Sequence, residues 1–364
     1  MKPSPLHEQH TKLGASFTEI TGWTMPAQYG HVAAEYTAVR RTVGITDLSH
    51  RGRLRVTGDD RTKWLQSIIS NDILPLATGR GLYSSLLTHK GKMLTYFRIY
   101  ALPDALLVED AGDIGDTTMQ TLRKFLLYGT KAKMESLRDS WCLLLVSGPR
   151  SVDLIRAALG VEAGALAPLS CLSHTVEGTS VMLLRTQETG ETDFEVLVPT
   201  EHVGAIWDRL WQAGQPLGLR AFGTDAHEAL RIEAGLPQAG ADLTEEIVPP
   251  EANLEGKAFS LSKGCYPGQE VVARMDTYGN VRRHLVGLRV ESDALPVKGA
   301  KLFSGDREVG WVSSAVRSPS VNNPIALGFP LRDFSSPGTA LTIEVEGTKV
   351  PATVTALPFS STKT

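Results

Sequence analysis

The stretch after residue 280 differs in pattern from the chain before it, and this change constrains the fold more than any other feature. Short alternating runs occur at 301–303, 309–312 and 341–345, separated by glycine, proline and serine. Alternation of polar and apolar residues is typical of strands with one buried face, and short strands joined by turns are typical of small barrels and sandwiches. The sequence therefore predicts a domain boundary near residue 280, followed by a small β domain.

The chain before this boundary mixes strand and helix periodicities. Residues 53–57 alternate as in a half-buried strand, whereas Val32, Tyr36 and Val39 share one face of a predicted helix over 31–43. Strand candidates are often adjacent in sequence, which favours an α+β fold over a doubly wound parallel sheet. Because 364 residues exceed what a single hydrophobic core usually supports, we expect two or three domains.

The composition argues against several classes of protein. The formal net charge of −3 disfavours non-specific nucleic-acid binding, and no apolar run approaches the roughly 20 residues that a membrane helix needs. Cys142, Cys171 and Cys265 are odd in number and far apart. We therefore expect no disulfide framework, no metal site, no membrane or specific nucleic-acid partner, and a reducing, cytoplasmic setting.

Motifs of several common enzyme classes are missing from the sequence. The chain has no G-x-G-x-x-G opening a helix, no G-x-x-x-x-G-K-[ST] and no G-x-S-x-G. Dinucleotide-binding enzymes, P-loop nucleotide hydrolases and α/β-hydrolases are therefore not indicated.

Reactive side chains gather most densely in residues 263–274, Lys-Gly-Cys-Tyr-Pro-Gly-Gln-Glu-Val-Val-Ala-Arg. Lys263 and Arg274 flank Cys265, and nearby cations stabilise a thiolate and increase its reactivity. The alternative is a small buried cysteine at a tight turn. We name Cys265 and Lys263 as candidate catalytic residues. The candidates for supporting the loop around them are Gly264, Tyr266, Gly268, Gln269, Glu270 and Arg274, and whether Gln269 and Glu270 hold the loop or face a ligand stays open.

The same residues resemble the signature of a known family. Residues 263–270 with Arg274 look like the motif of the YgfZ family, folate-binding relatives of the glycine-cleavage T-protein (aminomethyltransferase) that are implicated in iron–sulfur cluster assembly and repair. The similarity to the T-protein superfamily extends over nearly the whole chain. The segments that carry it are 23–30, 39–50, 230–235, 309–319 and 357–359.

The resemblance implies an α+β, T-protein-like architecture of three domains around a central folate pocket. Residues 1–280 would form the folate-binding region, as two intertwined subdomains of approximately 1–50 plus 135–280 and 51–134. Residues 281–364 would form the C-terminal β-barrel. The implied cofactor is tetrahydrofolate or a one-carbon derivative, and the implied protein partners are iron–sulfur assembly factors or client enzymes.

Three ligand-contacting residues are also implied by the resemblance. Glu195 could accept two hydrogen bonds from the edge of the pterin ring, and its alternative is an exposed strand residue. Arg231 could bind a carboxylate or the pterin carbonyl, and its alternative is a helix-surface ion pair with Glu228 or Glu233. Tyr83 could stack on the ligand, and its alternative is a place in the core.

One departure from the T-protein pattern bears on function. Thr95 and Tyr96 stand where the T-protein carries two aspartates, and a threonine supplies neither charge nor a base near neutral pH. Our first hypothesis is therefore a tetrahydrofolate-binding factor for iron–sulfur cluster assembly or repair that uses Cys265. The second is a folate-dependent aminomethyltransferase, and the third is a binding module for another small ligand, so catalytic turnover stays open.

Overall fold

The computed structural model describes residues 1–279 and 281–359, and its chain divides into two units. Unit 1 comprises Met1–Leu65, Ile73–Leu82 and Phe97–His227. Unit 2 comprises Gln66–Asp72, Tyr83–Tyr96 and the chain from Glu228 onward. These boundaries differ from the division that we expected, which placed a boundary at 280 and subdomains at 1–50 plus 135–280 and 51–134. The expected division stays a prediction.

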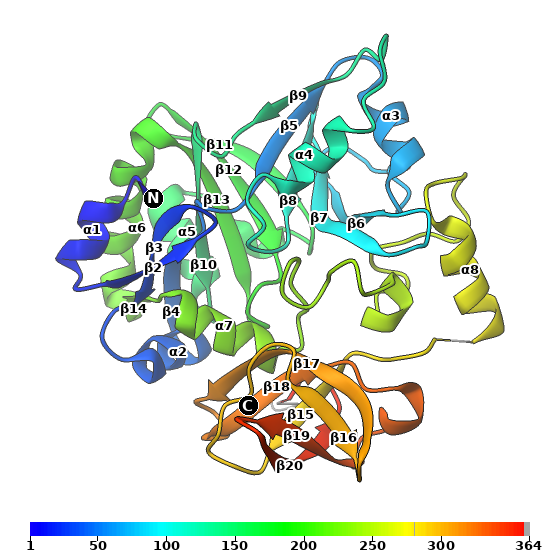
Figure 1. Ribbon diagram of the computed structural model, residues 1–364. Helices are drawn as coiled ribbons and strands as arrows, with labels where there is room; N and C mark the ends of the chain where they lie inside the picture. The colour runs from blue at the N-terminus through cyan, green and yellow to red at the C-terminus, as the bar shows by residue number, and fades with distance from the viewer. Residues whose placement is uncertain (280, 360–364) are drawn as a thin grey trace. The chain divides into compact units, whose positions relative to one another are not determined.

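A six-stranded sheet forms the centre of unit 1 (Figure 1). Its neighbouring strands pair antiparallel, except that the last two are parallel. In spatial order the strands are β11 (Cys171–Val176), β12 (Thr179–Thr186), β13 (Asp193–Pro199), β10 (Trp141–Ser147), β4 (Val43–Asp47) and β14 (Leu219–Ala221).

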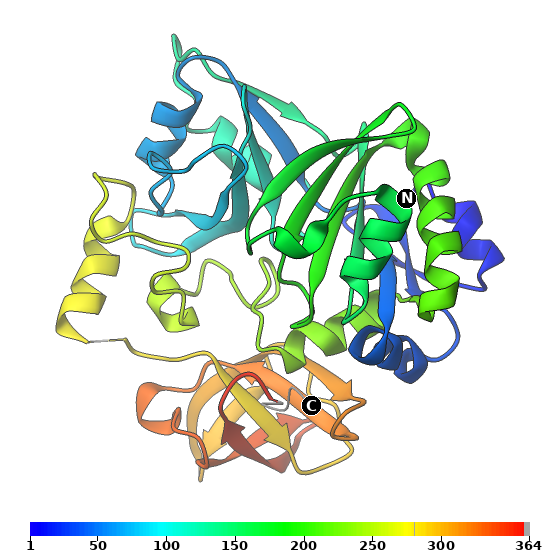
Figure 2. The ribbon, with the colours of Figure 1, turned by 180° about the vertical axis from the view of Figure 1, so that it is seen from behind.

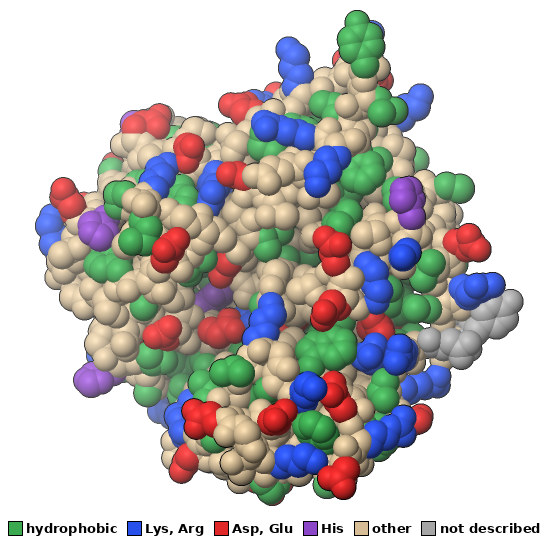
Figure 3. Space-filling view, viewed as in Figure 1, with side chains coloured by type: hydrophobic (Ala, Val, Ile, Leu, Met, Phe, Trp, Pro, Cys, Tyr) green, Lys and Arg blue, Asp and Glu red, His purple; other side chains and the backbone are tan. Residues whose placement is uncertain are grey.

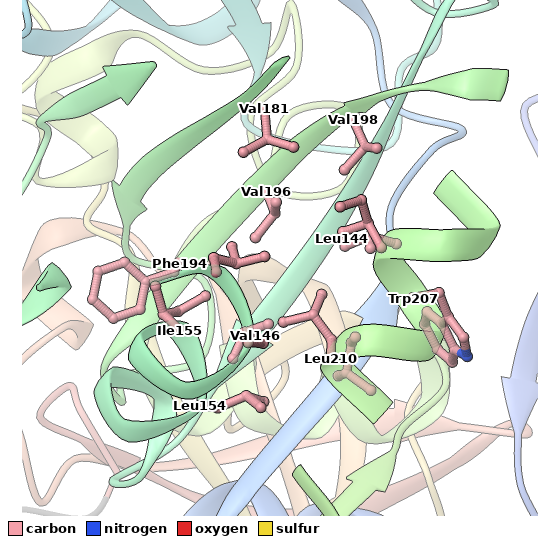
Figure 4. Close-up of a cluster of buried hydrophobic side chains, with 14 of the residues drawn as sticks. Leu144, Val146, Leu154, Ile155, Val181, Phe194, Val196, Val198, Trp207 and Leu210 are labelled. Atoms are coloured by element: carbon pink, nitrogen blue, oxygen red, sulfur yellow. The ribbon is translucent and has the colours of Figure 1, made fainter. Parts of the chain in front are cut away.

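One face of this sheet carries the main hydrophobic core. Helices α5 (Ser151–Leu159) and α6 (Val203–Gly214) pack against it, and Figure 4 shows Ile155 and Leu210 of these helices facing Val146 and Val196 of the strands. Burying a large aliphatic side chain stabilises the fold by about 1.5–3 kcal/mol, so the strands are held with their apolar residues toward these helices. The alternate residues of β13, including Glu195, must then point to the other face.

Close packing of helix α2 (Val32–Arg41) on β4 depends on a glycine. A Cβ atom on Gly44 would lie 2.5 Å from a methyl carbon of Val39 and 2.7 Å from the ring of Phe222. Only glycine therefore allows this approach without displacing its neighbours.

A second sheet has five strands. Its spatial order is β6 (Gly81–Leu87), β7 (Met93–Ala101), β8 (Leu106–Asp110), β5 (Arg53–Thr57) and β9 (Lys133–Ser136). A small third sheet contains β1 (Lys2–Pro3), β3 (Trp23–Gln28) and β2 (Ser16–Ile20). The remaining α-helices are α1 (His7–Lys12), α3 (Arg61–Ile68), α4 (Thr117–Arg123), α7 (Thr224–Glu233) and α8 (Gln269–Tyr278). The 3-10 helices are η1 (Ala163–Ala165), η2 (Thr200–His202), η3 (Gln215–Leu217), η4 (Pro249–Ala252) and η5 (Arg332–Phe334).

The C-terminal β-barrel that the sequence predicted is confirmed. Six strands close on themselves within unit 2, drawn from yellow-orange to red in Figures 1 and 2, around a core that includes Leu288, Ile343 and Val354. In order they are β15 (Val286–Val290), β18 (Asn323–Gly328), β17 (Arg307–Ser318), β16 (Lys301–Ser304), β19 (Ala340–Val345) and β20 (Thr348–Thr355). The mixed α/β composition of the preceding chain is confirmed as well.

One local prediction was wrong, because the loop expected around Gln269 and Glu270 instead begins helix α8. On the face seen in Figure 3, acidic and basic side chains are interspersed, in keeping with the small net charge. Among the described residues, no helix is both long enough and apolar enough to span a membrane.

Candidate functional site

A buried arginine in unit 1 gathers three glutamates. Arg98 lies on β7 opposite Glu109 of β8 in the strand register. Its Nη2 atom donates to Oε1 of Glu109 at 2.9 Å and to Oε1 of Glu195 at 2.8 Å, while Nη1 donates to Oε1 of Glu188 at 2.8 Å. Arg98, Glu109 and Glu195 are completely buried. We call Arg98, its three glutamates and Arg51 the Arg98 cluster below.

The chain before β13 positions Glu188 for this contact. Asp193, the first residue of β13, accepts the main-chain N–H groups of Glu188 at 2.7 Å and Thr189 at 2.9 Å. The second oxygen of Glu188 accepts a hydrogen bond from Nη1 of Arg51 at 2.7 Å. The loop between β12 and β13 is therefore held in one conformation, with Glu188 bridging two arginines.

Arg51 extends the network toward the surface of unit 1. Its Nε atom donates to Oδ1 of Asp113 at 3.0 Å, and Nε2 of His50 lies 2.9 Å from the same oxygen. On the other side, Nε2 of His227 lies 3.6 Å from Oε2 of Glu188. Arg51 is thus fixed by carboxylates on two sides, and the network links the chain that follows β4 with strands β7, β8 and β13.

The environment drives the pKa values of two neighbouring glutamates in opposite directions. Burial raises the pKa of Glu195 well above its ordinary value; Arg98 opposes this effect and Glu109 adds to it. Burial also acts to raise the pKa of Glu188, but Arg51 and Arg98 outweigh it and lower that pKa. Titratable groups with pKa values separated in this way are typical of functional sites.

Two oxygens of the cluster are unsatisfied. Oε2 of Glu109 and Oε2 of Glu195 are buried, and neither takes a hydrogen bond from any residue that the structure describes. Buried acceptors normally have a partner, so such atoms call for an explanation such as a proton, a water or a ligand.

The sequence contained a signal for this cluster that we did not use. Arg98 stands within residues 93–100, a run that is otherwise mostly apolar, as a buried strand would be. A charge inside a buried strand needs partners, which points to carboxylates on neighbouring strands. Of those partners we had singled out only Glu195. The alternative that Glu195 is an exposed strand residue is wrong, because its side chain is fully buried.

Lys263, in unit 2, is occupied by main-chain oxygens. Its Nζ atom donates to the carbonyls of Gln66 at 2.7 Å, Ile69 at 2.6 Å and Asn71 at 3.0 Å. An ammonium has three donors, so all of them serve the end of helix α3. Burial lowers the pKa of Lys263 to about 8, against a small opposing effect of Asp72. Its catalytic role stays a prediction that these contacts do not favour.

Cys265 lies at the surface, as do Glu270 and Arg274. The alternative of a buried cysteine is therefore wrong. The supporting residues hold the loop from within, since the side-chain amide of Gln269 donates to the carbonyl of Lys263 at 3.2 Å and the hydroxyl of Tyr266 donates to the carbonyl of Ser260 at 3.3 Å. Roles in catalysis or binding for these residues stay predictions.

The two glycines of this loop differ. Gly268 has φ of +80°, and a Cβ atom there would lie 2.4 Å from the main-chain oxygen of Thr88. Gly264 is exposed, and a Cβ atom there would meet nothing within 4 Å. The fold therefore requires glycine at the second position and not at the first.

Arg231, also in unit 2, is paired with acidic groups of its own unit. Its guanidinium donates to Glu228, to Oδ2 of Asp242 at 2.9 Å and to the hydroxyl of Ser314 at 2.7 Å. The ion pair with Glu228 that we weighed as the alternative is thus present. Contact between Arg231 and a ligand stays a prediction.

Tyr83 takes part in a buried stack of unit 2. Its ring lies parallel to that of Tyr96 with the centroids 5.2 Å apart, and Nζ of Lys257 lies 4.8 Å from the centre of the Tyr83 ring. Thr95 is buried, and its Oγ1 has no hydrogen-bond partner within residues 1–279 and 281–359. Stacking of Tyr83 on a ligand stays a prediction.

A metal centre finds no support in the part of the chain that the structure describes. Within it, no group of three or more histidine, cysteine, aspartate or glutamate residues is placed to hold a metal ion.

Comparison with known proteins identifies the family of the chain. Residues 6–261 match the GCVT N-terminal domain, and residues 283–360 match the glycine cleavage T-protein C-terminal barrel domain. Aminomethyltransferase of Saccharopolyspora erythraea is 34% identical, covering 98% of each chain. Aminomethyltransferase of Cutibacterium acnes is 33% identical, covering 99% of this chain and 98% of the relative. The crystal structure of glycine cleavage system aminomethyltransferase T from Bartonella henselae superimposes with a TM-score of 0.88 at 27% identity, covering 99% and 98% of the two chains.

These relatives correct our first functional hypothesis. A main function in iron–sulfur cluster assembly or repair is wrong, because the full-length relatives are named aminomethyltransferase, which was our second hypothesis. Membership of the T-protein superfamily is confirmed, whereas the YgfZ subtype is not shown. Aminomethyltransferases of this family use tetrahydrofolate, the cofactor that the resemblance implied.

Proposed function

Because the chain belongs to the family defined by the GCVT N-terminal and T-protein C-terminal barrel domains, we propose that it is a folate-dependent aminomethyltransferase. Both domains are present, and the relatives cover nearly the full length of the chain. The likeness of residues 263–270 to the YgfZ signature remains a sequence likeness, and no role in iron–sulfur chemistry follows from it.

The observation that carries this proposal is the pair of buried, unsatisfied oxygens in the Arg98 cluster. A pterin ring presents adjacent N–H donors along one edge, and a carboxylate accepts two such hydrogen bonds in a fixed orientation. Oε2 of Glu195 is an acceptor without a partner among the residues that the structure describes, so the donor set of the cluster suits the pterin.

In this proposal Glu195 binds the pterin edge, and Arg98 holds Glu195 in place through the hydrogen bond from its Nη2. Arg51 and Glu188 brace Arg98 from the opposite side. Tyr83 remains the proposed ring contact. Tetrahydrofolate, when bound, supplies the nitrogen that accepts the one-carbon unit.

Thr95 limits what the protein can contribute to proton transfer. A hydroxyl remains neutral near pH 7 and cannot take the role of a carboxylate base. The buried Oγ1 of Thr95 can orient a polar group by hydrogen bonding. In this proposal Thr95 therefore positions such a group and does not transfer a proton.

Two measurements test this function. An assay with an aminomethylated lipoyl carrier and tetrahydrofolate should yield the one-carbon folate product. Titration calorimetry should show tetrahydrofolate binding to the wild type and its loss in Glu195→Gln, whereas Glu201→Gln, an exposed glutamate, should bind normally. Binding without product would contradict the transferase and leave a folate-binding module; absence of binding would contradict both.

Two further statements belong to this proposal. We place the protein in a reducing compartment such as the cytoplasm, because Cys142, Cys171 and Cys265 are all unpaired. We also retain the division into a folate-binding region over 1–280 and a barrel over 281–364, which limited proteolysis between residues 276 and 286 would test by releasing two stable fragments.

A further inference from the structure

Glu109 and Glu195 come to the same atom of Arg98 from different sheets. Glu109 belongs to β8 of the five-stranded sheet and Glu195 to β13 of the six-stranded sheet. Both use Oε1 to accept from Nη2, at 2.9 Å and 2.8 Å. Since one nitrogen carries both contacts, the two carboxyl groups are immediate neighbours in a fully buried position.

Charge in this region is unbalanced if every acid is ionised. Among the groups joined by direct ion pairs, two arginines face four carboxyl groups, and the acids are Glu109, Glu188, Glu195 and Asp113. Asp113 is also paired with His50, and Arg53 acts on Glu109 and Glu195 without a direct ion pair, because its hydrogen bonds go to main-chain oxygens. Glu188 bridges both arginines and is the acid best stabilised as a carboxylate. Glu109 and Glu195 share a single Nη2, and each of two adjacent buried carboxylates disfavours the ionised form of the other. The excess negative charge therefore falls on this pair.

We propose that Glu109 shares one proton with Glu195 in the ligand-free protein, and that binding of a pterin edge to Glu195 expels this proton to solvent. The inference rests on the proposed function for its ligand. It fits the side-chain contact between Glu195 and Glu109, and it gives two buried carboxyl groups that each hold an unsatisfied oxygen a hydrogen bond to one another. Glu109 is in this view a positioning residue that sets the protonation state of Glu195.

The chemistry of the ligand gives the direction of the proton transfer. An ionised carboxylate offers only acceptors, whereas a carboxylic acid carries a donor on one oxygen. A ligand edge made of adjacent N–H donors therefore selects the ionised form of Glu195. Binding converts the protonated pair and the ligand into a complex and releases one proton. The tetrahydrofolate affinity should therefore rise with pH over the range in which the ligand-free pair is protonated.

Other charged groups around Glu195 do not replace the pair in this role. Arg98 stays cationic. Burial alone would lower its pKa, but Glu109 and Glu195 outweigh burial and raise this pKa well above the ordinary value. Glu188 stays ionised between its two arginines. The groups that act on Glu195 or on its direct neighbours are Arg98 and Tyr100 on β7, Glu109 and Asp110 on β8, Asp113 after β8, Arg53 on β5, Arg51 after β4, Glu188 before β13 and His227 on α7.

Calorimetry on the full-length protein tests the coupling. Tetrahydrofolate is titrated at one pH in two buffers with different ionisation enthalpies, which gives the number of protons released. We expect the wild type to release about one proton per folate and its affinity to rise about tenfold per pH unit on the acid side. Glu109→Gln donates an amide hydrogen to Glu195 and should keep it ionised, so the release should fall to near zero and the affinity should no longer depend on pH.

Matched variants separate this role from a structural one. Glu109→Asp keeps an acid at the position and should restore the release, while Glu201→Gln should behave as the wild type. A purely structural role for Glu109 would lower the affinity equally at every pH. Equal proton release in wild type and Glu109→Gln, or wild-type binding without proton release, would overturn the shared proton.

A ligand-free measurement distinguishes failure of this inference from failure of the proposed function. Infrared spectroscopy near neutral pH should show the C=O stretch of a protonated carboxyl group that is present in the wild type and lost in Glu109→Gln. The comparison of the two spectra separates this band from that of Asp110, a buried acid whose pKa burial also raises. If tetrahydrofolate does not bind at all, the proposed function fails, and this band alone then decides whether the pair holds a proton. Absence of the band in the wild type overturns the inference.

Discussion

The Nζ atom of Lys263 donates a hydrogen bond to the main-chain oxygen of Ile69 at 2.6 Å, and it makes two similar bonds to the neighbouring turns. The lysine beside Cys265 therefore satisfies carbonyl groups where helix α3 ends. Such groups have no partner within the helix and need one from elsewhere in the structure. Proximity in sequence suggested that Lys263 activates the cysteine; its contacts indicate that it stabilises the fold.

Replacing Lys263 with methionine should destabilise the protein. The buried carbonyl oxygens would lose a charged donor, and hydrogen bonds to charged groups contribute about 1.5–3 kcal/mol. We expect a loss of that size in the free energy of unfolding measured with urea, whereas Lys90→Met, at an exposed lysine of the same unit, should change little. Unchanged stability with lost transferase activity would instead support the catalytic role.

The two loop glycines should respond differently to alanine. Gly268→Ala combines a left-handed backbone conformation with a Cβ that overlaps the main-chain oxygen of Thr88, and together these should cost about 2–4 kcal/mol. Gly264→Ala has neither problem and serves as the matched control. Thermal and urea unfolding of both variants would measure the difference, and equal stability would contradict the loop conformation described above.

The pH dependence of the unfolding free energy should reflect the raised pKa of Glu195. Because its pKa in the folded state lies above the ordinary value, its contribution is fully present below the unfolded pKa and is lost as the pH rises through the folded value. Glu195→Gln removes this titration. Relative to the wild type, the variant should therefore gain unfolding free energy as the pH is raised from acid to neutral and alkaline values. A constant difference across the series would show that Glu195 titrates alike in both states.

Thiol reactivity should single out Cys265. In the folded protein Cys265 is exposed, whereas Cys142 and Cys171 are buried, and burial raises the pKa of Cys171 to about 11. We expect one rapid reaction with a disulfide reagent, absent in Cys265→Ala, and two further reactions only on unfolding. The variant should retain aminomethyl transfer and tetrahydrofolate binding. Loss of transfer in this variant, with the fold intact, would restore a catalytic role for the cysteine.

Local pattern predicted the elements whose stability depends on one repeating contact face. Alternation over 341–345 identified strand β19, and the apolar stripe of Val32, Tyr36 and Val39 identified helix α2. Each pattern reports which side of an element is buried, which is a property of neighbouring residues in the chain. The same information fails where a turn decides the outcome, as at Gly268, after which helix α8 begins.

The environment of Glu195 was decided by tertiary structure. Its hydrogen bond to Arg98 spans 97 residues of sequence, and its neighbour Glu109 comes from a different sheet. The sequence determined that a charge stood in each strand, and the resemblance determined the family. Only the folded chain placed two acids on one guanidinium nitrogen, because protonation depends on burial and distance, and both arise from contacts between segments far apart in the chain.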